Sequence, residues 1–238
     1  VQHLLETQDD ITTRTASVGH TPVTIHAPLD GSPAPVVVVA HGFSGSRPLM
    51  KPFSTTLARN GYVAVSYDAL GHGLNPAPLS GDVTREDGAT QKLLEELGRV
   101  IGFAAGLPEA SDGLALLGHS MAADIVVRGA MRHEAADATV AVSMFSPAPT
   151  ANAPSNLLII VGDWEGSLKE EARRVLQQAT GEDAVAGQTY DDLGPAGARR
   201  IAFAPNVEHI GVLYSPDAMR EATDWLNRSE EHTSELQS

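Results

Sequence analysis

The 238-residue sequence contains no cysteine, few aromatic residues and no apolar run long enough to cross a membrane. Without cysteine the fold depends on no disulfide, and no thiolate can hold a metal ion. Basic residues are in the minority, because 16 Lys and Arg stand against 30 Asp and Glu, giving a net charge of −14. This balance argues against a nucleic-acid-binding surface. We therefore expect a soluble domain that does not bind nucleic acid.

What the chain does contain is an alternation of strand and helix patterns. Apolar residues make up 42% of the sequence, and its length suits one large α/β domain. The β-branched run Val36–Ala40 is typical of a strand buried on both faces of a parallel sheet. Ile11–Val18 and Pro22–Ala27 have the alternating pattern of an antiparallel hairpin. The other strands are expected at Tyr62–Tyr67, Gly113–Leu117, Thr139–Phe145, Leu157–Val161 and Arg200–Ala204.

Helical patterns separate these strands, so we expect a mostly parallel, eight-stranded sheet with helices on both faces. Because Asn152–Leu157 leads directly into a strand, there is no room for a helical lid there, and we expect no large cap domain. The helices are expected at Leu49–Arg59, Thr84–Ala105, Leu168–Ala179 and Pro216–Leu226, with a further helix running through Asp124–Arg128.

The most informative stretch is Gly118-His119-Ser120-Met121-Ala122, between an apolar strand and a helix. It has the form G-x-S-x-A, one residue from the G-x-S-x-G nucleophile elbow. An elbow strains its serine and exposes the hydroxyl, and it needs small residues where strand and helix pass closely. A serine before a helix is also often a simple N-cap. The strand before Ser120 and the helix after it favour the nucleophile.

A serine hydroxyl needs a general base oriented by a third group. His209 is the best candidate for the base, because it follows the last strand and lies late in the chain. Two carboxylates follow the Leu157–Val161 strand, Asp163 and Glu165, and either can serve as the acid. The sequence contains no H-E-x-x-H motif and no paired histidine spacing, so we expect no metal and no cofactor.

Taken together, these motifs resemble the α/β-hydrolase superfamily over nearly the whole chain, from about Thr21 to Leu226. The pieces that match are His41-Gly42-Phe43-Ser44-Gly45, the turn Asp68–Gly73, the elbow at Ser120 and the late His209. The turn is similar to the family's D-x-x-G-H-G motif, which is usually structural. The chain departs from the family at Ala122, which replaces the usual glycine. It also departs at the position of the acid, where the family spacing selects a glutamate. The short form resembles lidless bacterial serine esterases and dienelactone-hydrolase-like members.

The resemblance also bears on the acid and the oxyanion hole. The usual spacing puts the acid three residues after the strand's glycine, which selects Glu165 ahead of Asp163. Glutamate can hold the imidazole tautomer as aspartate does. The oxyanion hole is expected to combine the backbone N–H of Met121, after the nucleophile, with that of Phe43, after the first buried strand.

The predicted function is a carboxylic ester hydrolase working through an acyl-enzyme, and the small-molecule ester is expected to carry a short acyl group. The same fold also supports amidase, lactonase, dienelactone hydrolase or perhydrolase chemistry. An alternative of another class is a non-catalytic binding domain that keeps the fold.

The last residues, Arg228–Ser238, are polar, lack a core-facing side and resemble the in-frame translation of a sequencing adapter. We therefore expect a catalytic domain over residues 1–227 and a non-native, disordered tail over 228–238, in a gene assembled from metagenomic reads. Some similar bacterial hydrolases carry membrane segments beside the catalytic domain. A cytoplasmic, periplasmic or membrane-tethered location of the natural bacterial protein is compatible with the sequence.

Overall fold

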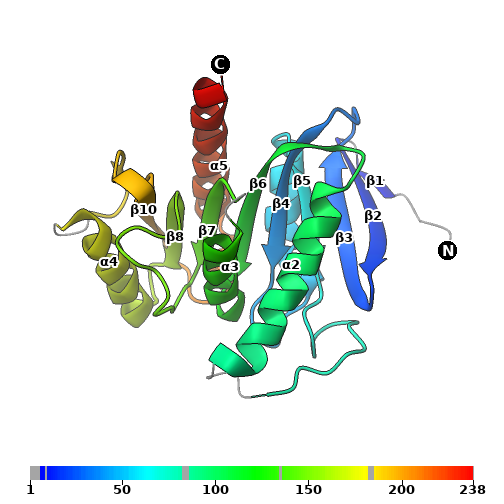
Figure 1. Ribbon diagram of the computed structural model, residues 1–238, viewed down its shortest axis with the longest axis horizontal. Coiled ribbons are helices and arrows are strands. Elements are labelled where there is room, and N and C mark those ends of the chain that lie inside the picture. The colour runs from blue at the N-terminus through cyan, green and yellow to red at the C-terminus, as the bar shows by residue number, and fades with distance from the viewer. Residues whose placement is uncertain (1–5, 9, 82–85, 134–135, 182–184, 238) are drawn as a thin grey trace. The chain divides into compact units, whose positions relative to one another are not determined.

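The computed structural model describes residues 6–8, 10–81, 86–133, 136–181 and 185–237 (Figure 1). The chain divides into two compact units, residues 1–114 and 115–238. The strand that ends at the nucleophile elbow, β6 (Ala110–His119), begins in the first unit and ends in the second.

In the first unit the strand order is β1-β2-β3-β5-β4. β1 pairs with β2, β2 with β3 and β3 with β5, and all three pairs are antiparallel. β4 and β5 are parallel. This unit contains β1 (Glu6–Gln8), β2 (Ile11–Val18), β3 (Thr21–Pro28), β4 (Ala34–Ala40), the turn of 3₁₀ helix η1 (Arg47–Met50), α1 (Lys51–Arg59), β5 (Val63–Tyr67), the π-helical turn η2 (Glu86–Thr90) and α2 (Gln91–Ala105).

In the second unit the order is β6-β7-β8-β10-β9, and all pairs are parallel except β10 with β9. Its elements after β6 are α3 (Met121–Arg132), β7 (Ala138–Val142), β8 (Leu157–Gly162), α4 (Gly166–Thr180), β9 (Thr189–Tyr190), η3 (Gly194–Ala196), β10 (Arg199–Ala204), η4 (Gly211–Tyr214) and α5 (Pro216–Gln237). In this unit α3 and α4 cover one face of the strands and α5 the other (Figure 1).

The core of the second unit explains why its strands are apolar without alternation. Every residue of β7 and β8 is buried, as expected for parallel strands covered on both faces. Val127 of α3 and Val175 of α4 pack with Ile159 of β8 in one cluster. In the first unit the apolar side of α2 is buried as its spacing predicts, through Leu93, Leu94, Leu97, Val100 and Ile101.

The described residues form ten strands, two more than the eight expected. The additional strands, β1 and β9, have three and two residues. Such short pieces carry no readable periodicity. One expected strand is also shorter, because β7 ends at Val142 rather than Phe145. The start of the helix expected at Thr84 lies outside the described residues, and its regular part begins at Gln91.

No helix interrupts residues 143–156, the connection between β7 and β8 that the structure describes in full. The expectation that no large cap domain is inserted there is confirmed.

The closing helix is longer than expected. We predicted its end at Leu226, but α5 continues to Gln237. The backbone of residues 228–237 is thus helical where we expected a disordered tail. Ser229 is buried and donates to the carbonyl of Trp225, and Arg228 pairs with Asp191. The non-native origin of the segment stays a prediction.

The turn Asp68–Gly73 has the structural role that its motif predicts. The Asp68 carboxylate is buried and accepts the amide N–H groups of Arg47 and Leu74, at 2.8 and 2.9 Å. A Cβ atom at Gly73 would lie 2.4 Å from that carboxylate, so only glycine fits. Buried Glu96 accepts the amide of Leu70 at 2.8 Å, and burial raises the pKa of Glu96.

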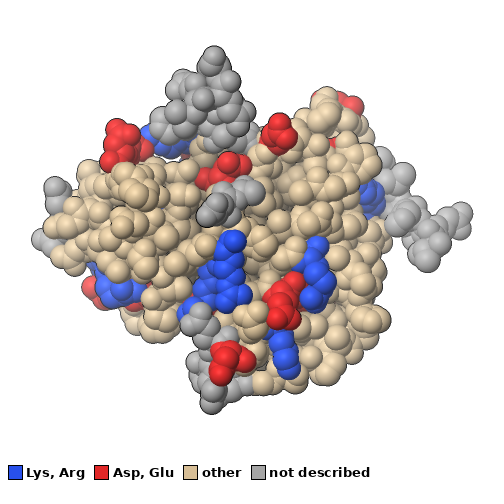
Figure 2. Space-filling model, viewed as in Figure 1, with Lys and Arg blue, Asp and Glu red and all other residues tan. Residues whose placement is uncertain are grey.

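On the face shown in Figure 2, acidic and basic side chains lie among wide areas of other residues. Among the helices of the described residues, none is both long and apolar enough to span a bilayer. The described part of the chain also holds no group of three or more His, Asp or Glu side chains placed to bind a metal ion.

Candidate active site

Ser120 lies at the sharp turn between β6 and α3, as the motif predicts. Its backbone has φ 55° and ψ −119°, a left-handed conformation that is costly for a residue other than glycine. Its amide donates to Val142 at the end of the neighbouring strand, and its carbonyl accepts the amide of Ala123, both at 2.9 Å. The expected strain at Ser120 is therefore present, and the surrounding hydrogen bonds maintain it.

The small residues on either side of Ser120 are required by close packing. A Cβ atom at Gly118 would lie 2.4 Å from the carbonyl oxygen of Ala122 and 2.8 Å from a methyl group of Val126. The first of these contacts is with backbone, which cannot move aside like the end of a flexible side chain. Ala122 is itself 3% exposed. The elbow thus has no space for a larger residue on the strand side.

We predict that Gly118→Ala destabilises the protein by about 1–3 kcal/mol, the usual effect of overpacking. Urea unfolding followed by circular dichroism measures the change. Gly102→Ala is the matched control, because Gly102 lies in α2 and a Cβ atom there would meet nothing within 4 Å. The control is expected to be stabilised by roughly 0.5–1 kcal/mol through helix propensity. Equal stability of Gly118→Ala and the wild type would contradict the packing argument.

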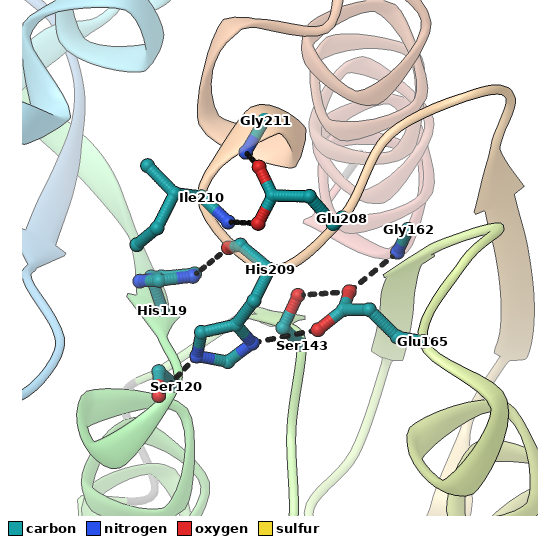
Figure 3. Close-up of polar contacts among 9 residues, drawn as sticks. All are labelled: His119, Ser120, Ser143, Gly162, Glu165, Glu208, His209, Ile210 and Gly211. Carbon is teal, nitrogen blue, oxygen red and sulfur yellow. Dashed lines mark hydrogen bonds and ion pairs between the residues drawn. The ribbon is translucent and has the colours of Figure 1, made fainter.

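His209 lies in the loop after β10, and its imidazole connects two other predicted residues (Figure 3). Its Nε2 lies 2.8 Å from Ser120 Oγ, and its Nδ1 lies 2.6 Å from Glu165 Oε1. Because a carboxylate only accepts hydrogen bonds, Nδ1 carries the proton and Nε2 accepts that of the serine. The side chain of His209 is 41% exposed, whereas that of Glu165 is 6% exposed.

Of the two candidate acids, Glu165 contacts His209 and Asp163 does not. Glu165 precedes the first residue of α4, and its Oε2 accepts the amide of Gly162 at 2.7 Å. Asp163 instead forms an ion pair with Lys169 at 2.9 Å, and its side chain is 49% exposed. The geometry therefore favours the residue that the spacing selected.

The two residues expected to form the oxyanion hole lie in different units. Met121 is the first residue of α3 in the second unit. Phe43 follows β4 in the first unit, where its exposed ring meets the edge of His72 at a centroid distance of 5.4 Å. His41 steadies that loop by donating from Nδ1 to the carbonyl of Gly42 and accepting the amide of Ala69 at Nε2. The pairing of Phe43 with Met121 stays a prediction.

Three further residues around His209 and Glu165 were not singled out from the sequence (Figure 3). His119 donates from Nε2 to the backbone carbonyl of His209 at 2.8 Å, with the two rings 4.8 Å apart. Ser143 donates from Oγ to Glu165 Oε2 at 2.7 Å. Glu208 accepts the amides of the two residues after His209, and these amides hold the pKa of its carboxyl below the usual range.

These three residues share no sequence signal, because each acts through a contact made by folding. The ring of His119, for example, reaches a backbone carbonyl that lies 90 residues away along the chain. The effect of all three is to restrict the positions that the imidazole and the carboxylate can take.

Mostly parallel strands flanked by helices, with a strained serine at the turn after β6, are features of the α/β-hydrolase fold. The chain belongs to the family described as serine aminopeptidase, S33, whose model matches residues 31–195. The family is one of hydrolases, and the matched region contains Ser120 and Glu165 and ends before His209. No match is found among curated protein sequences.

Several solved structures have the same fold at low sequence identity. An esterase of Pyrococcus furiosus is 18% identical with a TM-score of 0.64, over 95% of this chain and 92% of that one. A putative dienelactone hydrolase of Klebsiella pneumoniae is 16% identical with a TM-score of 0.63, over 92% and 99%. The methylesterase BT1017 is 15% identical with a TM-score of 0.64, over 93% of this chain, which spans 55% of that longer protein.

Proposed function

We propose that the protein hydrolyses carboxylic esters with Ser120 as nucleophile, His209 as general base and Glu165 as the acid that orients it. The single observation that carries the proposal is the unbroken chain of hydrogen bonds from the Ser120 hydroxyl through the imidazole to the carboxylate. A hydroxyl without such a base is a poor nucleophile at neutral pH, and each group here has the partner that its role requires.

In the proposed reaction, Ser120 Oγ attacks the ester carbonyl carbon while its proton passes to Nε2 of His209. Glu165 stabilises the resulting imidazolium without taking its proton. The tetrahedral intermediate collapses as Nε2 returns the proton to the departing alkoxide, which leaves as the alcohol. Water then attacks the acyl-enzyme, again with His209 as base, and releases the carboxylic acid and the free serine. The amides of Met121 and Phe43 are the proposed donors to the oxyanion.

We infer a preference for short acyl groups from the connection between β7 and β8, which carries no helical lid to cover a long chain. We expect kcat/KM not to rise from p-nitrophenyl acetate or butyrate toward the decanoate, since added methylenes that no helix of this connection covers stay in water and add no binding free energy. Initial rates over this series measure the preference. A maximum at decanoate would contradict the short-acyl inference but leave the ester chemistry intact.

Amide hydrolysis is the second candidate, because the family description names an aminopeptidase. The solved structures with this fold include an esterase, a methylesterase and a putative dienelactone hydrolase, and these relatives favour esters. A panel of amino-acid p-nitroanilides beside the p-nitrophenyl esters separates the two. Because p-nitrophenyl esters are intrinsically the more reactive substrates, anilide turnover that is lost in Ser120→Ala would favour the peptidase, and its absence would favour the esterase.

A non-catalytic binding domain is separated from both by a fluorophosphonate probe, which labels only an activated serine. We expect stoichiometric labelling at Ser120, identified by peptide mass spectrometry. A protein that is folded and does not label would contradict the proposed function as a whole.

A further inference from the structure

Ser143 is the first residue after β7, and its backbone has φ 51°. This left-handed conformation costs free energy for any residue with a Cβ atom, and glycine adopts it without that cost. The amide of Ser143 donates to the carbonyl of Ile160 at 2.7 Å, which keeps the residue against the end of β8. The side chain is buried, with 2% of the residue exposed. A serine is thus held in a conformation that would suit glycine better.

The left-handed conformation of Ser143 places its hydroxyl against the carboxylate of Glu165. Its Oγ lies 2.7 Å from Oε2 of Glu165, and the amide of Gly162 lies 2.7 Å from the same oxygen (Figure 3). Both groups donate to Oε2, which leaves Oε1 directed at Nδ1 of His209, 2.6 Å away. Each of the two carboxylate oxygens therefore has its own set of donors.

A glutamate needs this restraint more than an aspartate would, because its longer side chain has one additional rotatable bond. The Gly162 amide alone fixes one direction of the Oε2 atom. The Ser143 hydroxyl approaches from a different strand end and fixes a second direction. A Cβ atom at Gly162 would lie 2.9 Å from Oε2, so glycine at this position leaves the space that the carboxylate needs.

We propose that Ser143 is a positioning residue for the reaction: it is kept in a left-handed conformation so that its hydroxyl holds the Glu165 carboxylate in the orientation that directs His209. The proposal rests on the proposed function, because it assumes that Glu165 orients a catalytic histidine. Ser143 touches neither His209 nor Ser120 in the hydrogen bonds of this structure, so it acts through Glu165 alone.

The matched variants Ser143→Gly and Ser143→Ala test this, because both remove the hydroxyl but only glycine removes the strain. We expect each to lower kcat for p-nitrophenyl butyrate by roughly 10- to 100-fold, the usual range for loss of a supporting hydrogen bond, with KM changed less than about twofold. We also expect Ser143→Gly to melt at a higher temperature than Ser143→Ala. A purely structural serine would give a glycine variant that is fully active.

Asp192→Gly is the control for strain relief itself. Asp192 is exposed and also left-handed, with φ 57°, in the loop before η3. We expect it to leave kcat unchanged and the melting temperature unchanged or raised. If this variant lost activity as Ser143→Gly does, the loss could not be assigned to the hydroxyl, and the proposal would be overturned.

A double-mutant cycle distinguishes action through Glu165 from an independent effect. In a Glu165→Gln background, Ser143→Gly is expected to lower the residual kcat by less than about twofold, because the group it positions is already lost. Multiplicative losses would overturn the proposal. Its failure is distinct from failure of the proposed function, in which the wild type itself neither turns over esters nor labels with fluorophosphonate.

Discussion

Replacing Ser120 by alanine is expected to lower kcat for p-nitrophenyl butyrate by a factor on the order of 10⁶ and to abolish fluorophosphonate labelling. The hydroxyl is the only atom of Ser120 that reaches His209 Nε2, and alanine leaves the base without a proton to accept. Any remaining hydrolysis would reflect binding and the oxyanion donors. Steady-state rates on purified protein, with the probe as an independent readout, measure both effects.

The matched control is Ser111→Ala. Ser111 lies near the start of β6, at the opposite end of the strand from the elbow, and is exposed. It is expected to keep wild-type rates and labelling. The two variants should also melt within a few degrees of the wild type, because neither serine fills a core position. Turnover by Ser120→Ala within tenfold of the wild type would remove Ser120 as the nucleophile.

The fold was predictable from the sequence wherever burial leaves a pattern. Parallel strands that are covered on both faces are continuously apolar, so Val36–Ala40 and Leu157–Val161 were located within a few residues of their observed ends. The hairpin of β2 and β3 was equally clear from its alternation. Strands of two or three residues, such as β9, depend on pairing with a neighbour and leave no such pattern.

Chain ends and turns were harder to predict, because local composition does not set them alone. The polar stretch after Leu226 was expected to be disordered, yet α5 continues through it. The stretch contains three Glu residues, which favour helix, and it has no Gly or Pro to end the helix that begins at Pro216. The early end of β7 at Val142 follows from the left-handed turn at Ser143. That turn was not predictable, because a serine, unlike a glycine, is not typical of a left-handed conformation.

At the candidate site, the sequence selected residues by their order along the chain and by the spacing after each strand. The structure brings three of them together: His209 lies within hydrogen-bonding distance of Ser120 on one side and of Glu165 on the other. Their chemical roles remain the proposal. The supporting contacts of His119 and Ser143 could not be predicted, because they join strand ends that come together only in the folded sheet.

The identity of the acid gives the second large effect: Glu165→Gln is expected to lower kcat by about 10⁴-fold. The reason lies in the donors around the carboxylate. The Gly162 amide and the Ser143 hydroxyl both donate to Oε2, so the amide oxygen of a glutamine takes that place. Its NH₂ group then faces His209 Nδ1, which must become an acceptor, and the proton moves to Nε2. An imidazole in that tautomer cannot accept the proton of Ser120.

Asp163→Asn is the matched control, since it makes the same acid-to-amide change two residues earlier in the chain. Asp163 pairs with Lys169 at the surface and contacts no atom of His209 among the hydrogen bonds of the described residues. We expect its kcat to stay within about twofold of the wild type, because an exposed ion pair contributes little. Rates for both variants with p-nitrophenyl butyrate decide between the two acids. Loss of activity in Asp163→Asn with retention in Glu165→Gln would assign the role to Asp163, and the hydrogen bond seen between Glu165 and His209 would then be one that catalysis does not use.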